Sequence, residues 1–248
     1  TLASALLANG VHLVGRSFKY HRPRGFFGAG VDEPYALVQM NRNNEVDPNV
    51  RATEQELFEG LEAKSVNCWP NVDFDIGAIN NFLGKFFPAG FYYKTFMWPK
   101  SFWYKIYEPI IRKAAGFGAA SIKHDKEKYE HKYEYCDLLI TGSGPSGLAS
   151  AYAAAQNGAK VILAEDKSRF GGSLLTSEVT IGNQSGQEWA EKIISELKSM
   201  PNVVVKNRSQ VFGYYDHNML VMSERISDHL PKTEKYIPKQ RLWYIRAK

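Results

Sequence analysis

The sequence predicts an α/β protein in which an incomplete Rossmann-type dinucleotide-binding domain follows a smaller α+β unit. The first observation is that strand-like and helix-like segments alternate after residue 134, which is typical of βαβ units and a parallel sheet. The second is a loop with three glycines, Gly142, Gly144 and Gly147, between an apolar strand and a helix. The third is that one helix and several short strands precede this pattern, within residues 1–66.

The composition is that of a globular protein and argues against several classes. Lys and Arg number 31 against 26 Asp and Glu and are interleaved with them, so the formal charge of +5 does not indicate nucleic acid. Cys68 and Cys136 are too few for a disulfide framework, and neither lies in a zinc-binding pattern, which favours a reducing, cytoplasmic location. We find no leader peptide and no run of about 18 apolar residues, and therefore expect no membrane association. Because the chain begins at Thr1 and ends in a strand, we expect it to be a fragment.

The first predicted element is a helix over residues 1–10. Its apolar residues lie on one helical face, and Asn9-Gly10 is a suitable end for it. Strands are predicted over residues 11–14 and 35–40, on either side of the Pro- and Gly-rich loop HRPRGFFGAG. Together they indicate a small α+β domain over residues 1–66, truncated at its N-terminus.

Residues 67–134 are predicted to connect the two domains. Within them, residues 82–107 contain twelve aromatic side chains between basic ones, and Pro88, Gly90 and Pro99 prevent one continuous helix. We interpret this segment as packing against a partner or another domain; plain core, nucleic-acid stacking and a membrane interface are the alternatives. The charged run KHDKEKYEHKYEY, from Lys123, is predicted to be a solvated linker or an exposed helix at a domain boundary.

Residues 135–248 are assigned to the Rossmann-type domain, truncated at its C-terminus. Strands are predicted over 135–141, 160–165 and 202–206, and helices over 145–157 and 186–200. Residues 211–215 and 219–226 are predicted to form an antiparallel hairpin, and the last eight residues a further strand.

Each glycine of the loop has a mechanical role in binding a diphosphate. Gly142 permits a tight turn, Gly144 lets the backbone approach a pyrophosphate, and Gly147 lets the helix lie close to the sheet. The helix N-terminus offers N–H groups and the positive end of its dipole to the phosphates. Pro145 is tolerated in the first helical turn, where its missing N–H has no partner to lose. A tight turn that binds nothing is the alternative.

An acidic residue completes the fingerprint. Glu165 lies 18 residues beyond Gly147, at the end of the second strand, where it would accept hydrogen bonds from an adenosine ribose. Glu165 and Asp166 together should repel a 2′-phosphate, which favours NAD or FAD over NADP, although Lys167 and Arg169 could bind a phosphate. The predicted cofactor-binding residues, including a second glycine turn after the strand, are Gly142, Ser143, Gly144, Pro145, Ser146, Gly147, Glu165, Asp166, Lys167, Gly172, Ser173, Leu174 and Val211.

Other polar residues do not form a recognisable site. His21, Arg22 and Arg24 form a basic loop that is interpreted as solvated rather than bound to an anionic cofactor. The remaining histidines show no metal-binding spacing, and no His/Asp constellation accompanies the serines of the glycine turns. We therefore predict no metal site and no serine nucleophile.

Several longer stretches resemble the α subunit of heterotetrameric sarcosine oxidase. They are TLASALLANGVHLVGRSFKYHRPRG, the GSGPSG loop, VILAEDKSRFGGSLL, the YYDHN hairpin and RLWYIRAK. The resemblance implies a β-grasp, ferredoxin-like domain followed by a Rossmann-type domain that binds NAD. It is weakest around residues 40–120.

The resemblance also bears on iron–sulfur clusters. Cyanide synthase and opine oxidase subunits of similar sequence carry cluster-ligating cysteines after an RPRG-like loop, and the corresponding positions here are Gly28, Glu33 and Ala36. Because a cluster needs about four thiolates and the sequence has two cysteines, we expect no iron–sulfur cluster and a scaffolding role for this domain.

The remaining cofactors implied by the resemblance belong to a larger assembly. The family enzyme oxidises sarcosine at FAD held by another subunit, FMN lies between the two large subunits, and tetrahydrofolate takes the one-carbon unit in the C-terminal half of the α chain. The implied partners are the β, γ and δ subunits. The resemblance implies that this chain contains the NAD site, with FAD as the alternative ligand. We assign no catalytic residue to the chain.

Two other functions stay open at this point. The chain could be part of a related amine or opine dehydrogenase or cyanide synthase-type subunit, which the sequence beyond residue 248 would decide. It could also be a scaffold whose bound dinucleotide supports assembly without turnover.

Overall fold

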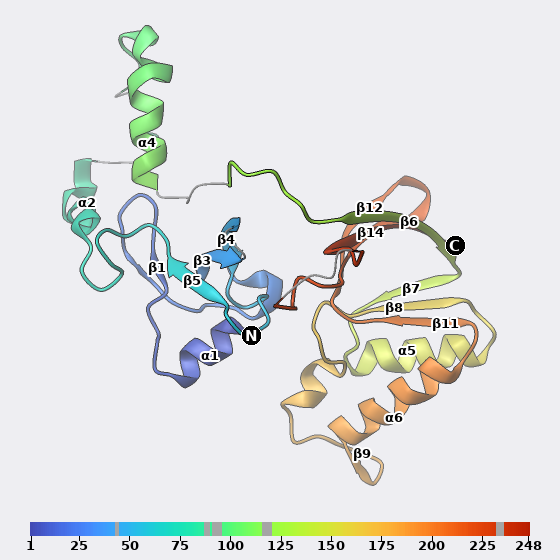
Figure 1. Cartoon of the computed structure of the whole chain (residues 1–248). Coiled ribbons are helices and arrows are strands. Elements are labelled where there is room, and N and C mark those ends of the chain that lie inside the picture. The colour runs from blue at the N-terminus through green and yellow to red at the C-terminus, as the bar shows by residue number, and fades with distance from the viewer. Residues whose placement is uncertain (43–44, 87–89, 91–95, 116–120, 232–235) are drawn as a thin grey trace. The chain divides into compact units, whose positions relative to one another are not determined.

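The computed structural model describes residues 1–42, 45–86, 90, 96–115, 121–231 and 236–248. The chain divides into two compact units, Thr1–Asp125 (unit 1) and Lys126–Lys248 (unit 2). Figure 1 shows the elements of each. None of the helices in the described ranges is both long and apolar enough to cross a membrane.

Unit 1 begins with the predicted helix and is built on a three-stranded antiparallel sheet. Helix α1 (Leu2–Ala8) is capped by Thr1, whose Oγ1 accepts a hydrogen bond from the backbone N of Ser4 at 3.3 Å. The sheet has the order β4-β3-β5. Its strands, and a separate two-residue pair, are β3 (Leu37–Arg42), β4 (Glu45–Arg51), β5 (Glu62–Ser65), β1 (Gly15–Arg16) and β2 (Pro23–Arg24).

One face of α1 packs on the sheet to form the core of unit 1. The buried side chains are Leu2, Ala3, Val14, Ala36, Val38, Met40 and Ala52. Backbone hydrogen bonds join the same parts, since the N–H of Ala3 donates to the carbonyl of Ala52 at 2.9 Å. The strand predicted over residues 11–14 is wrong: regular pairing begins only at Gly15, and Val14 contributes a buried side chain from the preceding loop.

The short turn η1 (Gly30–Asp32) lies in the loop between β2 and β3. The helical elements that follow the sheet of unit 1 are η2 (Ile76–Ala78), α2 (Ile79–Phe82), η3 (Leu83–Phe86), η4 (Lys100–Phe102), the π-helical turn η5 (Trp103–Tyr107) and α4 (Glu108–Ala115). Part of the aromatic segment 82–107 lies outside the described residues, namely 87–89 and 91–95. Within the described part, Phe82, Phe86, Trp98 and Tyr104 are strongly exposed. Packing of this segment against a partner stays a prediction.

Unit 2 contains the predicted parallel sheet, with the strand order β11-β8-β7. Its strands are β7 (Leu138–Thr141), β8 (Val161–Ala164) and β11 (Val203–Lys206), connected by α5 (Pro145–Gln156) and α6 (Gly186–Ser199). Both helices cover one face, as Figure 1 shows, and their apolar residues form a core with Val161 and Leu163 of the central strand. Two β–α–β units therefore form as the alternation predicts.

A second sheet covers the other face of the parallel sheet. It has the order β12-β13-β14-β6, with strands β12 (Ser209–Tyr215), β13 (Met219–Arg225), β14 (Gln240–Ala247) and β6 (Tyr129–Cys136). The predicted hairpin is β12 and β13, joined by η7 (Asp216–Asn218). Met222, Trp243 and Ile245 of this sheet pack against Ile162 and Ala164 of β8. Two short strands, β9 (Thr180–Ile181) and β10 (Gln184–Ser185), and the turn η6 (Gly172–Leu175) lie before α6.

The charged run that begins at Lys123 forms the predicted linker only in part. Residues 123–128 lie in no helix or strand, at the boundary between the two units, whereas residues 129–135 belong to β6, which pairs in parallel with β14 along its whole length. Charged residues on neighbouring strands face each other, as in the 2.8 Å contact between Arg241 Nε and Glu130 Oε2, and the Tyr133 and Tyr244 rings stack at 5.1 Å. A segment whose charged residues suggest an exposed linker therefore forms a strand, because β14 pairs with it.

The strand predicted over residues 135–141 is in fact two strands in different sheets. Asp137 separates β6 from β7, and its Oδ2 accepts a hydrogen bond from the backbone N of Lys160 at 2.8 Å. Since Cys136 faces the core between the sheets and Leu138 pairs with Val161, the chain changes sheet at this single residue.

A buried carboxylate organises the loop between β2 and β3 of unit 1. The Glu33 side chain is fully buried. Its Oε2 accepts hydrogen bonds from the backbone N of Phe27 at 2.7 Å and of Gly28 at 2.8 Å, and its Oε1 accepts from Tyr35 at 2.7 Å and Ala36 at 3.0 Å. Burial alone would raise the pKa of Glu33, but these four hydrogen bonds outweigh it and lower the pKa.

We expect Glu33→Gln to destabilise unit 1 strongly at neutral pH. The amide would turn an NH₂ group toward two of the four N–H donors, and each buried N–H without an acceptor costs about 1–3 kcal/mol, so the loss should be roughly 2–4 kcal/mol. Urea unfolding of wild type and variant measures it. Glu54→Gln, which weakens a partly exposed ion pair with Arg51, is the control and should change the free energy of unfolding little.

The same variant has an expected pH dependence. Because the folded pKa of Glu33 lies below its unfolded value, its contribution is complete above the unfolded pKa and is lost as the pH falls through the folded pKa. The difference between wild type and Glu33→Gln should therefore shrink in acid. A difference that grows in acid, or none at neutral pH, would contradict this role.

Candidate functional site

The glycine loop has the geometry that its sequence predicts. Gly142 leaves β7 with φ +88° and donates its N–H to the carbonyl of Ala164 at 2.7 Å. Gly144 is the N-cap of α5, and Pro145 is the first helical residue. A Cβ at Gly147 would lie 2.0 Å from the carbonyl oxygen of Gly142, so only glycine lets the helix approach the loop this closely.

Gly144 differs from Gly147 because it borders open space. A Cβ built on Gly144 meets no heavy atom within 4 Å. The space adjoins the N-terminus of the 12-residue helix α5, where the helix dipole favours negative charge. This is the position at which a diphosphate could touch bare backbone.

The second glycine turn closes against the first, as the sequence suggests. Gly172 has φ +54°, and a Cβ there would lie 2.9 Å from the Cα of Gly144. The N–H of Gly171 donates to the carbonyl oxygen of Ser143 and to its Oγ, both at 3.1 Å. The two turns therefore form one wall of the site.

Glu165 links the end of β8 to the glycine loop. Only 3% of its surface is exposed. Its Oε2 accepts hydrogen bonds from the backbone N of Ser143 at 2.8 Å and from the Ser143 hydroxyl, and its Oε1 accepts from the backbone N of Lys167 at 3.0 Å. The carboxylate thus points to the loop rather than away from it, and its first partner is Ser143.

Asp166 is half-buried beside this carboxylate and titrates unusually. Burial, together with the hydrogen bond and negative charge of Glu165, raises the pKa of Asp166 to about 6. Burial would also raise the pKa of Glu165, but hydrogen bonds from Asp166, Ser143 and Lys167 lower it. At neutral pH the pair therefore carries close to two negative charges, with Glu165 the more firmly ionised.

The structure distributes the other predicted cofactor-binding residues over different surroundings. Pro145, Ser146, Lys167 and Ser173 are exposed near the loop or the turn that follows β8. Leu174 is buried in the core beneath α5 and α6, and Val211 packs against the core between the two sheets. A role of these six in binding a cofactor stays a prediction.

Sequence reasoning missed the residues that fix the loop after β8. The Nη2 of Arg225, on β13, donates to the carbonyl oxygen of Asp166 at 2.8 Å, and the Nδ2 of Asn207 donates to that of Ser168 at 2.8 Å. Both lie more than 35 residues away in sequence from the groups they bind, and no local pattern marks them. The bridging hydroxyl of Ser143 could have been noticed, since it lies next to Gly142 and Gly144.

No group of three or more His, Cys, Asp or Glu residues that could hold a metal ion occurs in the part of the chain that the structure describes. The two cysteines belong to different units, Cys68 to unit 1 and the fully buried Cys136 to unit 2.

Comparison with known families identifies both parts of the chain. Residues 1–68 match a family described as a 2Fe-2S iron-sulfur cluster binding domain. Residues 137–218 match a family described as FAD dependent oxidoreductase. The fold is thus a ferredoxin-type domain followed by a dinucleotide-binding region.

Curated relatives match the whole chain. Sarcosine oxidase subunit alpha of Rhizobium meliloti (strain 1021) is 53% identical over 247 residues, which are 100% of this chain and 25% of that protein. The subunit of the same name from Corynebacterium sp. (strain U-96) is 28% identical over 253 residues, with 100% of this chain and 21% of that protein covered. The chain is a homologue of this subunit and spans about a quarter of its length.

A solved structure with the same fold is L-proline dehydrogenase from P. horikoshii. It aligns with 100% of this chain and 35% of its own chain at a TM-score of 0.53 and 16% identity. At this identity the likeness concerns the fold alone.

These comparisons correct the cofactor prediction. The expectation that the N-terminal domain belongs to a cluster-free type is contradicted by its match to a cluster-binding family. The expectation of NAD at the glycine loop has no support, because the matching family is FAD-dependent. The side chains present do not fit a cluster held by four thiolates, because the described residues include two cysteines, Cys68 and Cys136, which belong to different units, and we derive no step through one.

We expect Asp166→Asn to stabilise unit 2 at about pH 8 by roughly 1–2 kcal/mol, a value discounted for the partial exposure of this residue. Because the folded pKa of Asp166 is raised, its ionisation opposes folding above about pH 6, and the penalty disappears below the unfolded pKa. The gain should therefore vanish at about pH 4, as measured by urea unfolding at both pH values.

Asp137→Asn is the control of opposite sign. The pKa of Asp137 is lowered by hydrogen bonds from the Lys160 backbone and the Lys248 side chain, so this variant should lose stability at neutral pH. Equal stability of wild type and Asp166→Asn at about pH 8 would contradict the raised pKa.

Proposed function

We propose, from its homology with the N-terminal quarter of sarcosine oxidase α subunits, that this chain is the dinucleotide-binding part of a multi-subunit flavoprotein oxidoreductase. Within it, the glycine loop and Glu165 bind the ADP half of FAD, the cofactor named by the family that residues 137–218 match. The observation that carries the proposal is the open space beside Gly144, at the N-terminus of α5 and next to a buried carboxylate.

The loop offers hydrogen-bond donors and positive potential to a diphosphate. Backbone N–H groups at the start of α5 and the helix dipole supply the positive potential. Glu165 has two oxygens and already accepts bonds from Ser143 and Lys167, so a ribose hydroxyl would share the carboxylate with these donors. Asp166, which is partly neutral near pH 6, lies beside it and adds repulsion toward a 2′-phosphate at higher pH.

The activity of the whole protein is proposed on the same homology. We propose oxidation of sarcosine in an assembly with further subunits, the amine chemistry and any transfer of the one-carbon unit to tetrahydrofolate being the task of other parts. We place no catalytic residue in this chain. A scaffold that binds a dinucleotide without turnover is the second candidate, because both oxygens of Glu165, the carboxylate next to this space, already accept hydrogen bonds from Ser143 and Lys167.

The assembled protein distinguishes these two functions. If the bound dinucleotide takes part in turnover, its absorbance should change when sarcosine is added under anaerobic conditions, and Gly144→Val should abolish that change. For a scaffold, Gly144→Val would weaken assembly and leave sarcosine oxidation by the remaining assembled protein unchanged.

We expect Gly144→Val to abolish binding of ADP without unfolding the chain. Its φ of −66° suits any residue, and a Cβ meets no protein atom, so the new side chain fills only the space meant for the ligand. In wild type, ADP at about 100 times its Kd should raise the melting temperature by several degrees. Thermal shift with ADP, FAD, NAD and NADP measures this and shows which dinucleotide binds.

Two further variants serve as controls for this experiment. Ala153→Val places the same valine side chain at an exposed position of α5 and should keep the shift. Gly147→Ala should unfold unit 2, because its Cβ collides with the Gly142 carbonyl. If wild type shows no shift with any of the four ligands, or if Gly144→Val keeps it, the loop does not bind a dinucleotide.

A further inference from the structure

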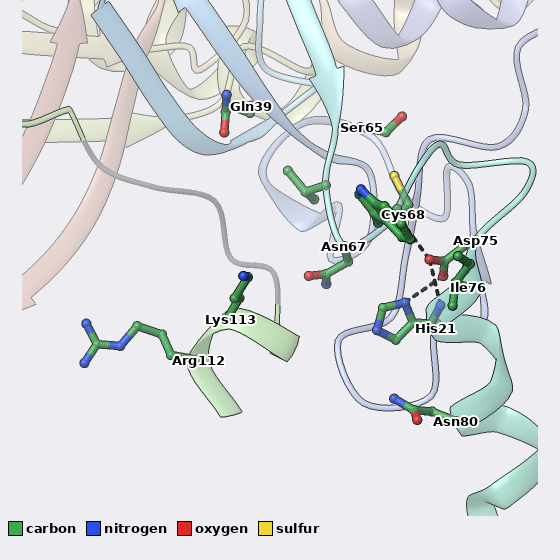
Figure 2. A pocket seen from close by; sticks show the side chains of 13 residues that line it. His21, Gln39, Ser65, Asn67, Cys68, Asp75, Ile76, Asn80, Arg112 and Lys113 are labelled. Carbon is green, nitrogen blue, oxygen red and sulfur yellow. Dashed lines mark hydrogen bonds and ion pairs between the residues drawn. The ribbon is translucent and has the colours of Figure 1, made fainter. Parts of the chain in front are cut away.

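A second pocket lies within unit 1, away from the glycine loop. Its volume is about 520 Å³, which is the size of small-molecule sites. It lies between β3, the end of β5 and the turns η2 and α2, and Figure 2 shows its side chains. The polar groups that line it include His21, Gln39, Ser65, Asn67, Cys68 and Asn80.

The His21 ring is fixed by buried partners. Its Nδ1 lies 2.6 Å from Oδ2 of Asp75, whose side chain is completely buried, and Figure 2 shows this contact. Arg16 lies 3.8 Å from the same carboxylate oxygen and also donates to the carbonyl of His21 at 3.0 Å. The ring lies directly over Gly77, where a Cβ would be 2.2 Å from it. With Nδ1 held by Asp75, Nε2 is the ring nitrogen left for a ligand.

Two residues of the pocket have backbone conformations that non-glycine residues rarely adopt. His21 has φ +53° and Asn67 has φ +58°. Such residues persist where the surrounding structure holds them, and they gather at binding sites. In addition, Oδ1 of Asn67 is buried and accepts no hydrogen bond from any described residue. A buried acceptor without a donor costs free energy, and a ligand with an N–H or O–H group would remove that cost.

The charges around the pocket restrict the ligand further. Asp75 is already used by His21 and by the backbone N–H groups of Trp69 and Gly77, at 2.9 and 3.1 Å. Among the described lining residues, the pocket therefore offers no available carboxylate to balance a ligand of net positive charge. Lys113, on α4, lines the same pocket and suits an anion.

We propose that this pocket binds a small organic carboxylate that also carries a hydrogen-bond donor, such as an amino acid or a hydroxy acid. Asn67 Oδ1 accepts from the donor, His21 Nε2 bonds the same end of the ligand, and Lys113 faces the carboxylate. The site belongs to unit 1 alone, so it does not depend on a dinucleotide at the glycine loop.

Cys68 is a built-in reporter for this site. It lines the pocket, whereas Cys136, the other cysteine of the sequence, is fully buried with its pKa raised to about 11 by burial. Burial and the Asp75 charge also raise the pKa of the Cys68 thiol, so a thiol reagent is best applied at about pH 9. The labelling rate of Cys68, followed by mass spectrometry of the whole chain, then reports whether the pocket is occupied.

The experiment compares three probes of similar size, which are glycine, glycolate and acetate. We expect glycine or glycolate to slow labelling of Cys68 several-fold at saturation, and acetate, which has no donor, to bind at least about tenfold more weakly. Equal protection by acetate would refute the role of Asn67, and no protection by any of the three would refute the site.

Asn67→Gly separates binding from folding. Glycine relieves the positive φ, so the variant should be at least as stable as wild type, yet bind the protecting probe about tenfold more weakly. His217→Gly, which relieves φ +58° in unit 2, is the matched control and should leave protection unchanged. Full protection in Asn67→Gly would overturn the proposal.

Discussion

The candidate dinucleotide site depends on the hydrogen bonds that the backbone N–H and hydroxyl of Ser143 donate to the buried carboxylate of Glu165. A carboxylate this deeply buried must be compensated by donors, and the nearest ones are the amide and hydroxyl of the glycine loop. The parallel pairing of Thr141 with Ala164 brings the two strand ends to the same edge of the sheet. Since Ser143 also accepts from Gly171, a single serine joins both glycine turns and the acid. The shape of the site therefore follows from strand register and from the need to satisfy one charge.

Much of this arrangement could be predicted because local patterns encode it. The glycines at 142, 144 and 147 require particular backbone geometry, and the helices α5 and α6 follow from their apolar spacing. Strand β6 could not be predicted, because its Lys, Glu and Tyr residues become a strand only when β14 supplies partners about a hundred residues later. The link from Arg225 to Asp166 depends on the tertiary fold in the same way. The prediction that the N-terminal domain is of a cluster-free type is wrong, because the number of cysteines in one sequence does not show which family a domain belongs to.

The two units use the same physical device in different places. Glu33 in unit 1 and Glu165 in unit 2 are both buried carboxylates whose oxygens are satisfied mainly by backbone N–H groups. In each case hydrogen bonding outweighs burial and lowers the pKa. A loop held around a charge has few alternative conformations, because any other arrangement leaves the charge without donors. Each loop is thus held in one conformation by the hydrogen bonds that converge on its carboxylate.

The pairing of β6 with β14 has a consequence for biosynthesis. These are the first and last strands described in unit 2, and Glu130 accepts a hydrogen bond from Arg241, which lies 111 residues further along the chain. During translation, the parallel strands and their two helices can assemble while β6 still has an open edge. Until residues 240–247 have left the ribosome, the tyrosine-rich strand β6 therefore lacks the strand that it pairs with in the folded unit.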